Sequence, residues 1–250
     1  MYSSPDTEFL SSRNSEAAAG RIVAVDIART LAILGMVVFH FVRDLELFGL
    51  IEPGTTLTGS WAVFARLVAG SFLFLVGVSL VLAHGDGIRW NSFIRRSLIL
   101  LAAALAVSVA TLVSVPHRFI YFGILHAILV SSLLGLLLAD RPAWMSIVAG
   151  LGVVAVWAVW ARGVDLPPWM GWTGLAASPR PALDLIPLVP WLAPTLFGIA
   201  FAKVLGVVRW RAVSRPIESK LGWPGRHSLA IYLLHQPVII GLIWVFLRIP

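Results

Sequence analysis

Long apolar runs separated by short polar segments dominate the chain. Seven windows are long and apolar enough to cross the roughly 30 Å hydrocarbon core of a bilayer as helices of about 20 residues. The windows cover 22–48, 61–84, 92–115, 119–139, 143–161, 185–208 and 227–247. The pattern therefore predicts an all-α integral membrane protein, a polytopic bundle of about seven transmembrane helices.

The segments outside the windows are short. Residues 1–20 are polar and rich in serine, which predicts a disordered cytoplasmic tail. Segment 162–184 is rich in proline, glycine and tryptophan, which is typical of an interfacial loop, and Trp169 and Trp172 suit the headgroup region. The gaps leave no room for a separate soluble domain, so we expect residues 21–250 to form one transmembrane domain.

The composition agrees with a lipid environment. Hydrophobic residues make up 59% of the 250 positions and charged residues 12%, whereas soluble domains are about a quarter charged. The absence of cysteine from the sequence excludes disulfides and thiolate metal sites. The net charge of +7 is scattered over loops rather than gathered on one helical face, so no nucleic-acid partner is expected.

Lys and Arg residues are distributed unevenly between the two sides of the predicted bundle. With the first window starting inside, twelve lie in cytoplasmic segments and five in outer segments. Because basic residues hold loops on the cytoplasmic side, we predict a cytoplasmic N-terminus and an outer C-terminus. The expected location is the cell membrane, which in a bacterium is the inner membrane.

Four ionisable residues share one face of the first window. At about 100° per residue, Arg29 lies about 60° from Asp26, His40 lies about 20° from Arg29, and Asp44 returns to the direction of Asp26. An ionisable group at bilayer depth costs on the order of 3 kcal/mol, so a stripe of four is a candidate functional site. The alternative is an interfacial Asp26–Arg29 ion pair and an interior His40 with a structural hydrogen bond.

Other windows also contain ionisable residues. Arg66 in the second window either points into the bundle, where Asp44 lies at a similar depth as an acceptor, or snorkels to the outer interface. Arg95 and Arg96 in the third either anchor the helix at the cytoplasmic surface or bind phosphate. His126 in the fourth window and His235 in the last either hydrogen-bond a neighbouring helix or line the site.

Several motifs taken together resemble a known family. Asp26-x-x-Arg29, followed by an apolar run ending in His40, resembles the first helix of the transmembrane acyltransferase superfamily. The segments SFLFLVGVSL, FIYFGILHAI, LIPLVPWL and GRHSLAIYLLHQP resemble, in this order, the bacterial branch of the heparan-alpha-glucosaminide N-acetyltransferase catalytic-domain family. The resemblance covers most of residues 21–245.

This resemblance implies a transmembrane acyltransferase. The donor substrate would be cytoplasmic acetyl-CoA, the acceptor an amine or hydroxyl of a sugar or glycoconjugate on the outer side, and no metal is expected. His40 suits a general base or a transient acyl carrier, oriented by Asp44 as in a catalytic triad. The candidate residues are Asp26, Arg29, His40 and Asp44 for catalysis, Arg29, Arg95 and Arg96 for the donor, and Arg66, His126, His235 and Gln236 for the acceptor.

The chain departs from one branch of this superfamily. The animal N-acetyltransferase has asparagine where this chain has His40 and places its key histidine in the following loop, whereas loop 49–60 contains no histidine. The polysaccharide O-acetyltransferases do place arginine and histidine as Arg29 and His40 are placed. The acceptor, N- versus O-acetylation, direct transfer versus an acyl-enzyme, and a possible homodimer therefore stay open.

Two other functions fit some of the same residues. His40, His126 and His235 on different helices could ligate a b-type haem axially. A small-molecule transporter could place a polar path at the membrane midplane, although the sequence shows no inverted repeat.

Overall fold

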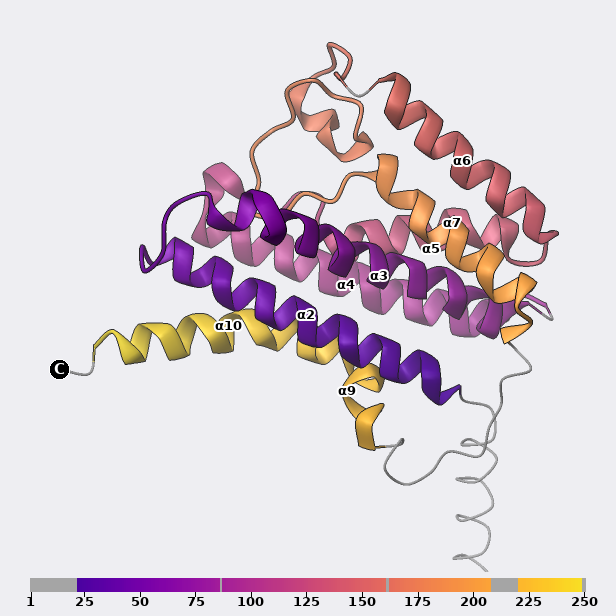
Figure 1. Ribbon diagram of the computed structural model, residues 1–250, viewed down its shortest axis with the longest axis horizontal. Helices are drawn as coiled ribbons and strands as arrows, with labels where there is room; N and C mark the ends of the chain where they lie inside the picture. The colour runs from indigo at the N-terminus through magenta and orange to yellow at the C-terminus, as the bar shows by residue number, and fades with distance from the viewer. Residues whose placement is uncertain (1–21, 86, 161, 208–219, 249–250) are drawn as a thin grey trace, which may run out of the picture.

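The computed structural model describes residues 22–85, 87–160, 162–207 and 220–248, and within them it is built of helices (Figure 1). The predicted tail at 1–20 lies outside the described residues. The helices are α2 (Val23–Leu47), α3 (Gly59–His84), α4 (Trp90–Ser114), α5 (Ile124–Ala139), α6 (Ala143–Val159), α7 (Leu188–Val204), α9 (Trp223–Arg226) and α10 (Ser228–Phe246). Three 3-10 turns lie between them: η1 (Thr55–Leu57), η2 (Pro116–Arg118) and η3 (Pro168–Thr173).

Seven of these helices coincide with the seven apolar windows, and the prediction of a helical membrane protein is confirmed. Four of them, α2, α3, α4 and α10, are long and apolar enough to cross a membrane. The helices α5, α6 and α7 are apolar but shorter, with 16, 17 and 17 residues. Together they make the protein a multi-pass membrane protein of helical class.

Helices α5 and α7 begin later in the chain than the windows that predicted them. The backbone N–H of Leu183 donates to the carbonyl of Arg118 at 2.7 Å, and that of Ile186 donates to Phe122 at 3.1 Å. These two segments therefore run side by side in an extended form. Pro187 lies just before α7 and has no N–H to continue a helical ladder, which explains why the helix starts late.

Asp184 fixes this paired segment to the start of α5. One of its carboxylate oxygens accepts the backbone N–H of Ile124 at 3.1 Å. A Cβ on Gly123 would lie 2.6 Å from the same oxygen, so the glycine makes the approach possible. Burial raises the pKa of Asp184 to about 6, although the hydrogen bond from the Ile124 N–H lowers this pKa.

Helices α3, α5 and α7 pack together and run in the same direction. Gly70 of α3 lies beside Trp191 near the start of α7, and Gly77 lies beside Thr195 further along. A Cβ on Gly77 would come within 3.0 Å of the Thr195 carbonyl oxygen, so the two backbones are in direct contact. These helices are the second, fourth and sixth spans, and alternate spans of a bundle with short connections must run in the same direction.

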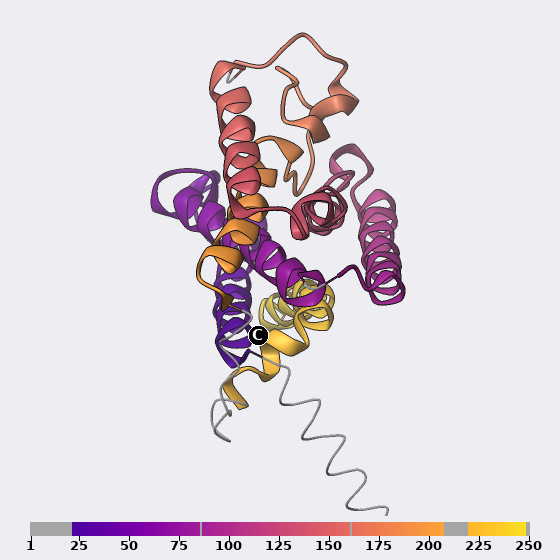
Figure 2. The same cartoon turned by 90° about the vertical axis from the view of Figure 1, so that its right-hand side faces the viewer.

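Helices α2 and α10 form a second parallel pair. They lie side by side in both views (Figures 1 and 2). Gly225, just before α10, touches the backbone of Asp26, and Gln236 further along α10 bonds Asp44. The first and last spans of a seven-helix bundle must point the same way, and this pair does.

The buried core lies among α3, α5 and α7, while the outer faces of the bundle are apolar. Leu73 and Ile199 are fully buried between these helices. Large apolar side chains are exposed along α4 and α6, among them Leu105, Val109 and Leu151. Exposed apolar faces of this kind suit contact with lipid chains.

Candidate functional site

Two histidine rings meet between α2 and α10. The ring centroids of His40 and His235 lie 4.9 Å apart, with an angle of 62° between the ring planes. Nδ1 of His235 lies 2.6 Å from the carbonyl oxygen of Tyr232. Because a carbonyl can only accept, this nitrogen carries the ring proton, and Nε2 of His235 carries the lone pair. Nε2 of His235 and Nδ1 of His40 are both buried and have no hydrogen-bond partner among the described residues.

A buried carboxylate and a half-buried amide lie beside the histidines. Nε2 of Gln236 donates to Oδ1 of Asp44 at 2.7 Å, and Asp44 has no exposed surface. The predicted triad-like hydrogen bond between Asp44 and His40 is not formed. The reason is that the His40 ring packs on His235, while Asp44, one turn further along α2, faces the Gln236 amide.

We call His40, Asp44, His235 and Gln236 the α2–α10 cluster. Six buried side-chain nitrogen or oxygen atoms in the described residues have no hydrogen-bond partner, and four of them belong to this cluster. An unpaired buried polar atom costs about 1–3 kcal/mol, and native structures contain few of them. Their concentration at one place makes the α2–α10 cluster the candidate site.

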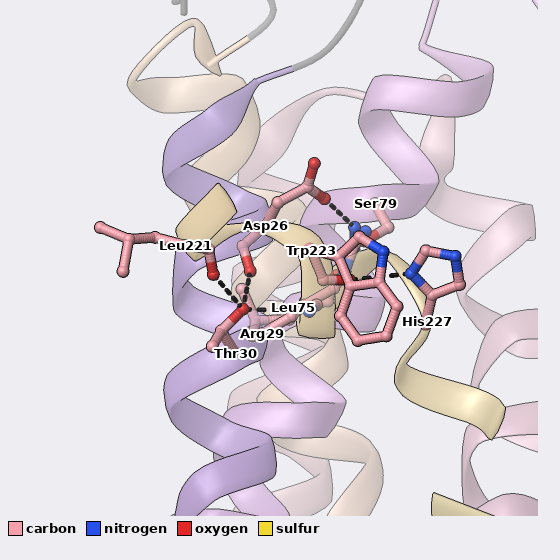
Figure 3. A network of polar contacts seen from close by, with 9 residues as sticks. Asp26, Arg29, Thr30, Leu75, Ser79, Leu221, Trp223 and His227 are labelled. Atoms are coloured by element: carbon pink, nitrogen blue, oxygen red, sulfur yellow. Dashed lines mark hydrogen bonds and ion pairs between the residues drawn. The ribbon is translucent and has the colours of Figure 1, made fainter. Parts of the chain in front are cut away.

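The other half of the predicted stripe connects α2 to α3 (Figure 3). Nη1 of Arg29 donates to Oδ1 of Asp26 at 2.8 Å, and Nη2 donates to Oγ of Ser79 at 2.7 Å. The Ser79 hydroxyl in turn donates to the carbonyl of Leu75 on its own helix. Arg29 is therefore held in place by groups from two helices.

The segment that precedes α10 is seated on the same part of α2 (Figure 3). The Thr30 hydroxyl lies 2.9 Å from the carbonyl of Leu221 and accepts the backbone N–H of Gly225 at 3.0 Å. A Cβ on Gly225 would come within 3.0 Å of the Asp26 carbonyl oxygen, so α9 packs directly on the α2 backbone. The start of α10 is thereby fixed in register with α2.

Further basic groups lie near Arg29. The guanidinium of Arg96 on α4 is close enough to repel that of Arg29, and it also acts on His84 at the end of α3. The backbone N–H of Arg89 donates to Nδ1 of His84 at 3.2 Å, so this ring nitrogen carries no proton. Arg29 on α2, Arg96 on α4 and Arg89 in the α3–α4 connection thus bring positive charge to one end of the bundle. Arg95 and Arg96 are both exposed.

Two predicted acceptor residues do not join the α2–α10 cluster. Both ring nitrogens of His126 have partners: Nδ1 accepts the N–H of Gly123 at 3.3 Å, and Nε2 lies 3.3 Å from Oγ of Ser108. His126 therefore links α5 to α4, as the structural alternative predicted. Arg66 is exposed on the surface of α3, as expected for an arginine that snorkels to the interface.

The sequence reasoning missed the role of Glu46. Its carboxylate accepts hydrogen bonds from Arg43 at 2.8 Å, from the Gly54 N–H at 2.8 Å, and from the Thr56 hydroxyl at 2.6 Å. These bonds close the connection between α2 and α3 beside the cluster. The available signal was the Arg-x-x-Glu spacing, which places Arg43 and Glu46 on one helical face.

Comparison with known proteins places these residues in a family. The sequence profile described as "Heparan-alpha-glucosaminide N-acetyltransferase, catalytic" matches residues 21–237, which include the whole α2–α10 cluster and the Asp26–Arg29 pair. Neither a curated protein nor a solved structure matches the chain. At the level of the family, the match supports a transmembrane acyltransferase. The chain therefore belongs to the heparan-alpha-glucosaminide N-acetyltransferase catalytic-domain family.

Proposed function

We propose that the protein transfers an acetyl group from cytoplasmic acetyl-CoA to an amine or hydroxyl of a sugar or glycoconjugate on the outer side of a bacterial inner membrane. The observation that carries this proposal is the α2–α10 cluster, whose four buried atoms lack hydrogen-bond partners. Family membership supports the reaction class, and the cluster is the support for locating the reaction between α2 and α10.

The unpaired atoms of the cluster suit an acceptor that donates hydrogen bonds. Oδ2 of an ionised Asp44, Oε1 of Gln236 and Nε2 of His235 are all hydrogen-bond acceptors. An amine or a hydroxyl offers the donors that these atoms lack. Acyl transfer also needs a base for the acceptor's proton, and an imidazole suits that role near neutral pH. His40 would act at the same place, as a base or as a transient acyl carrier.

The donor would bind at the opposite end of α2. Arg29, Arg89 and Arg96 concentrate positive charge there, and guanidinium groups bind phosphates well. Eleven residues separate Arg29 from His40, which corresponds to roughly 16 Å along the helix axis. The extended pantetheine arm of the donor would cover this distance and bring the thioester to the histidines.

The geometry argues against the haem alternative. The rings of His40 and His235 are in direct contact, which leaves no room for an iron and a porphyrin plane between them. His126 uses both ring nitrogens for contacts within the protein. The three histidines therefore do not form a pair of axial positions.

Vesicles with the purified protein would test the proposal. Acetyl-labelled acetyl-CoA is supplied on one side and an amine-bearing or hydroxyl-bearing sugar on the other, with protein-free vesicles as the control. We expect labelled, acetylated sugar on the side opposite the donor. Uptake of unmodified sugar in the absence of acetyl-CoA, without labelled product, would instead establish a transporter.

Arg96→Gln should weaken donor binding. Loss of a charge-assisted hydrogen bond of about 1.5–3 kcal/mol would raise the KM for acetyl-CoA at least about tenfold, with a smaller change in kcat. Arg95→Gln is the matched comparison, because it removes the same charge one residue earlier on α4. Equal effects of the two substitutions on KM would show that Arg96 has no special position relative to Arg29.

A further inference from the structure

The α2–α10 cluster contains two imidazoles, whereas the proposed reaction needs one base. We propose that His235, through Nε2, is the general base that takes the acceptor's proton, and that the Asp44–Gln236 pair positions it. This inference rests on the proposed function. It moves the base from His40, where the sequence placed it, to the last helix.

The hydrogen bonds of His235 fix its tautomer. Nδ1 must donate to the Tyr232 carbonyl at 2.6 Å, because that oxygen has no proton to give. Nε2 is then unprotonated in the neutral ring, and it is buried without a partner. A lone pair held in this way, aimed from a ring fixed at its other nitrogen, is the arrangement that a general base requires.

His40 has no comparable restraint. Its Nδ1 is buried and has no hydrogen-bond partner in the part of the chain that the structure describes. The predicted orienting partner, Asp44, bonds Gln236 instead. The ring centroids of His40 and His235 lie 4.9 Å apart. His40 therefore lies next to the proposed base and remains available to contact the acyl group.

The pair next to His235 holds the base in place. Gln236 follows His235 in the chain, and its amide bonds the fully buried Asp44 across the helix interface at 2.7 Å. This bond resists sliding or rotation of α10 against α2, because either motion would leave the Asp44 carboxylate without its donor. Asp44 and Gln236 are therefore positioning residues in this proposal.

His227 shares the pattern of His235, with Nδ1 2.9 Å from the Trp223 carbonyl oxygen, but its ring is exposed and lies outside the α2–α10 cluster. Two further histidines, His126 and His84, lack a free, defined lone pair. Nδ1 of His126 accepts the Gly123 N–H, which places the ring proton on Nε2, beside Ser108. Nδ1 of His84 likewise accepts the Arg89 N–H. Their lone pairs are occupied by backbone donors, whereas the lone pair of His235 faces no donor.

The step balances in atoms and charge. The acceptor nitrogen or oxygen bonds to the carbonyl carbon of the acetyl thioester, and its proton passes to Nε2 of His235. The C–S bond then breaks, the thiolate of coenzyme A leaves, and the imidazolium returns its proton to that thiolate. The products are the acetylated acceptor and the free thiol, and His235 is again neutral.

His235→Gln tests the assignment in the full-length protein. We expect kcat for the sugar acceptor to fall by about 10²–10⁴-fold, with the KM for acetyl-CoA changed much less. The matched control is His117→Gln, the same substitution at an exposed residue of η2, which should leave kcat unchanged. The melting temperature of each variant reports on folding.

A second acceptor separates a lost base from a damaged site. Hydroxylamine attacks thioesters without general-base assistance, so enzyme-dependent transfer to it, corrected for the uncatalysed reaction, should be largely retained in His235→Gln. Loss of both activities with an unchanged melting temperature would overturn the assignment, as would wild-type kcat with the sugar. If the wild-type protein itself produces no acetylated product with either acceptor, the proposed function fails instead.

Discussion

His40→Ala should reduce acetyl transfer by about 10²–10⁴-fold, the range expected when a group at the reacting centre is lost. His40 provides one of two imidazoles in contact at the α2–α10 cluster, 4.9 Å from His235. Its removal leaves the His235–Tyr232 and Gln236–Asp44 hydrogen bonds in place, so the helices should stay packed. The measurement is the initial rate of label transfer from acetyl-CoA to the sugar.

The control for this substitution is Phe41→Ala. Phe41 is the next residue on α2, and it is 46% exposed on the outer face of the helix. The Phe41→Ala variant should transfer acetyl groups at close to the wild-type rate. His40→Gln, which fills more of the vacated space, should be as inactive as His40→Ala with a wild-type melting temperature. Full transfer by either His40 variant would show that His40 has no role at the reacting centre.

The stripe on α2 could be predicted because helix geometry alone determines which residues share a face. Asp26 and Asp44 are eighteen residues apart, five helical turns, and both are buried in the structure. The partners of these residues could not be predicted in the same way. Gln236 is 192 residues from Asp44 along the chain, and the periodicity of one helix carries no information about which other helix it meets.

The roles of the histidines show the same limit. Depth in the membrane made His126 look similar to His40, but depth says nothing about hydrogen-bond partners. The two ring nitrogens of His126 contact the Gly123 N–H and the Ser108 hydroxyl. The Gly123 contact depends on the extended turn before α5. The window that predicted α5 included that turn as helix, because apolar composition does not distinguish a buried extended segment from a short helix.

Gly77→Ala should have the largest effect on folding. A Cβ at this position would lie within 3.0 Å of the Thr195 carbonyl oxygen and the backbone of Ile199, and backbone atoms cannot rotate away as a flexible side chain can. Helices α3 and α7 would have to separate along the core of the bundle. Overpacking of this kind costs about 3 kcal/mol, and the melting temperature of a domain this size would fall by roughly 6–12 °C.

Gly152→Ala is the matched control, and it should change stability in the opposite direction. Gly152 lies on α6 with open space around its missing Cβ, and alanine favours a helix over glycine by about 1 kcal/mol. Glycine to alanine therefore stabilises the helix at residue 152, whereas at residue 77 it destabilises the protein by breaking the α3–α7 backbone contact. Melting of both variants in one detergent compares them directly, and equal stabilities would contradict the close α3–α7 contact. Ser79, which holds Arg29, lies two residues beyond Gly77, so separation of α3 from α7 should also disturb donor binding.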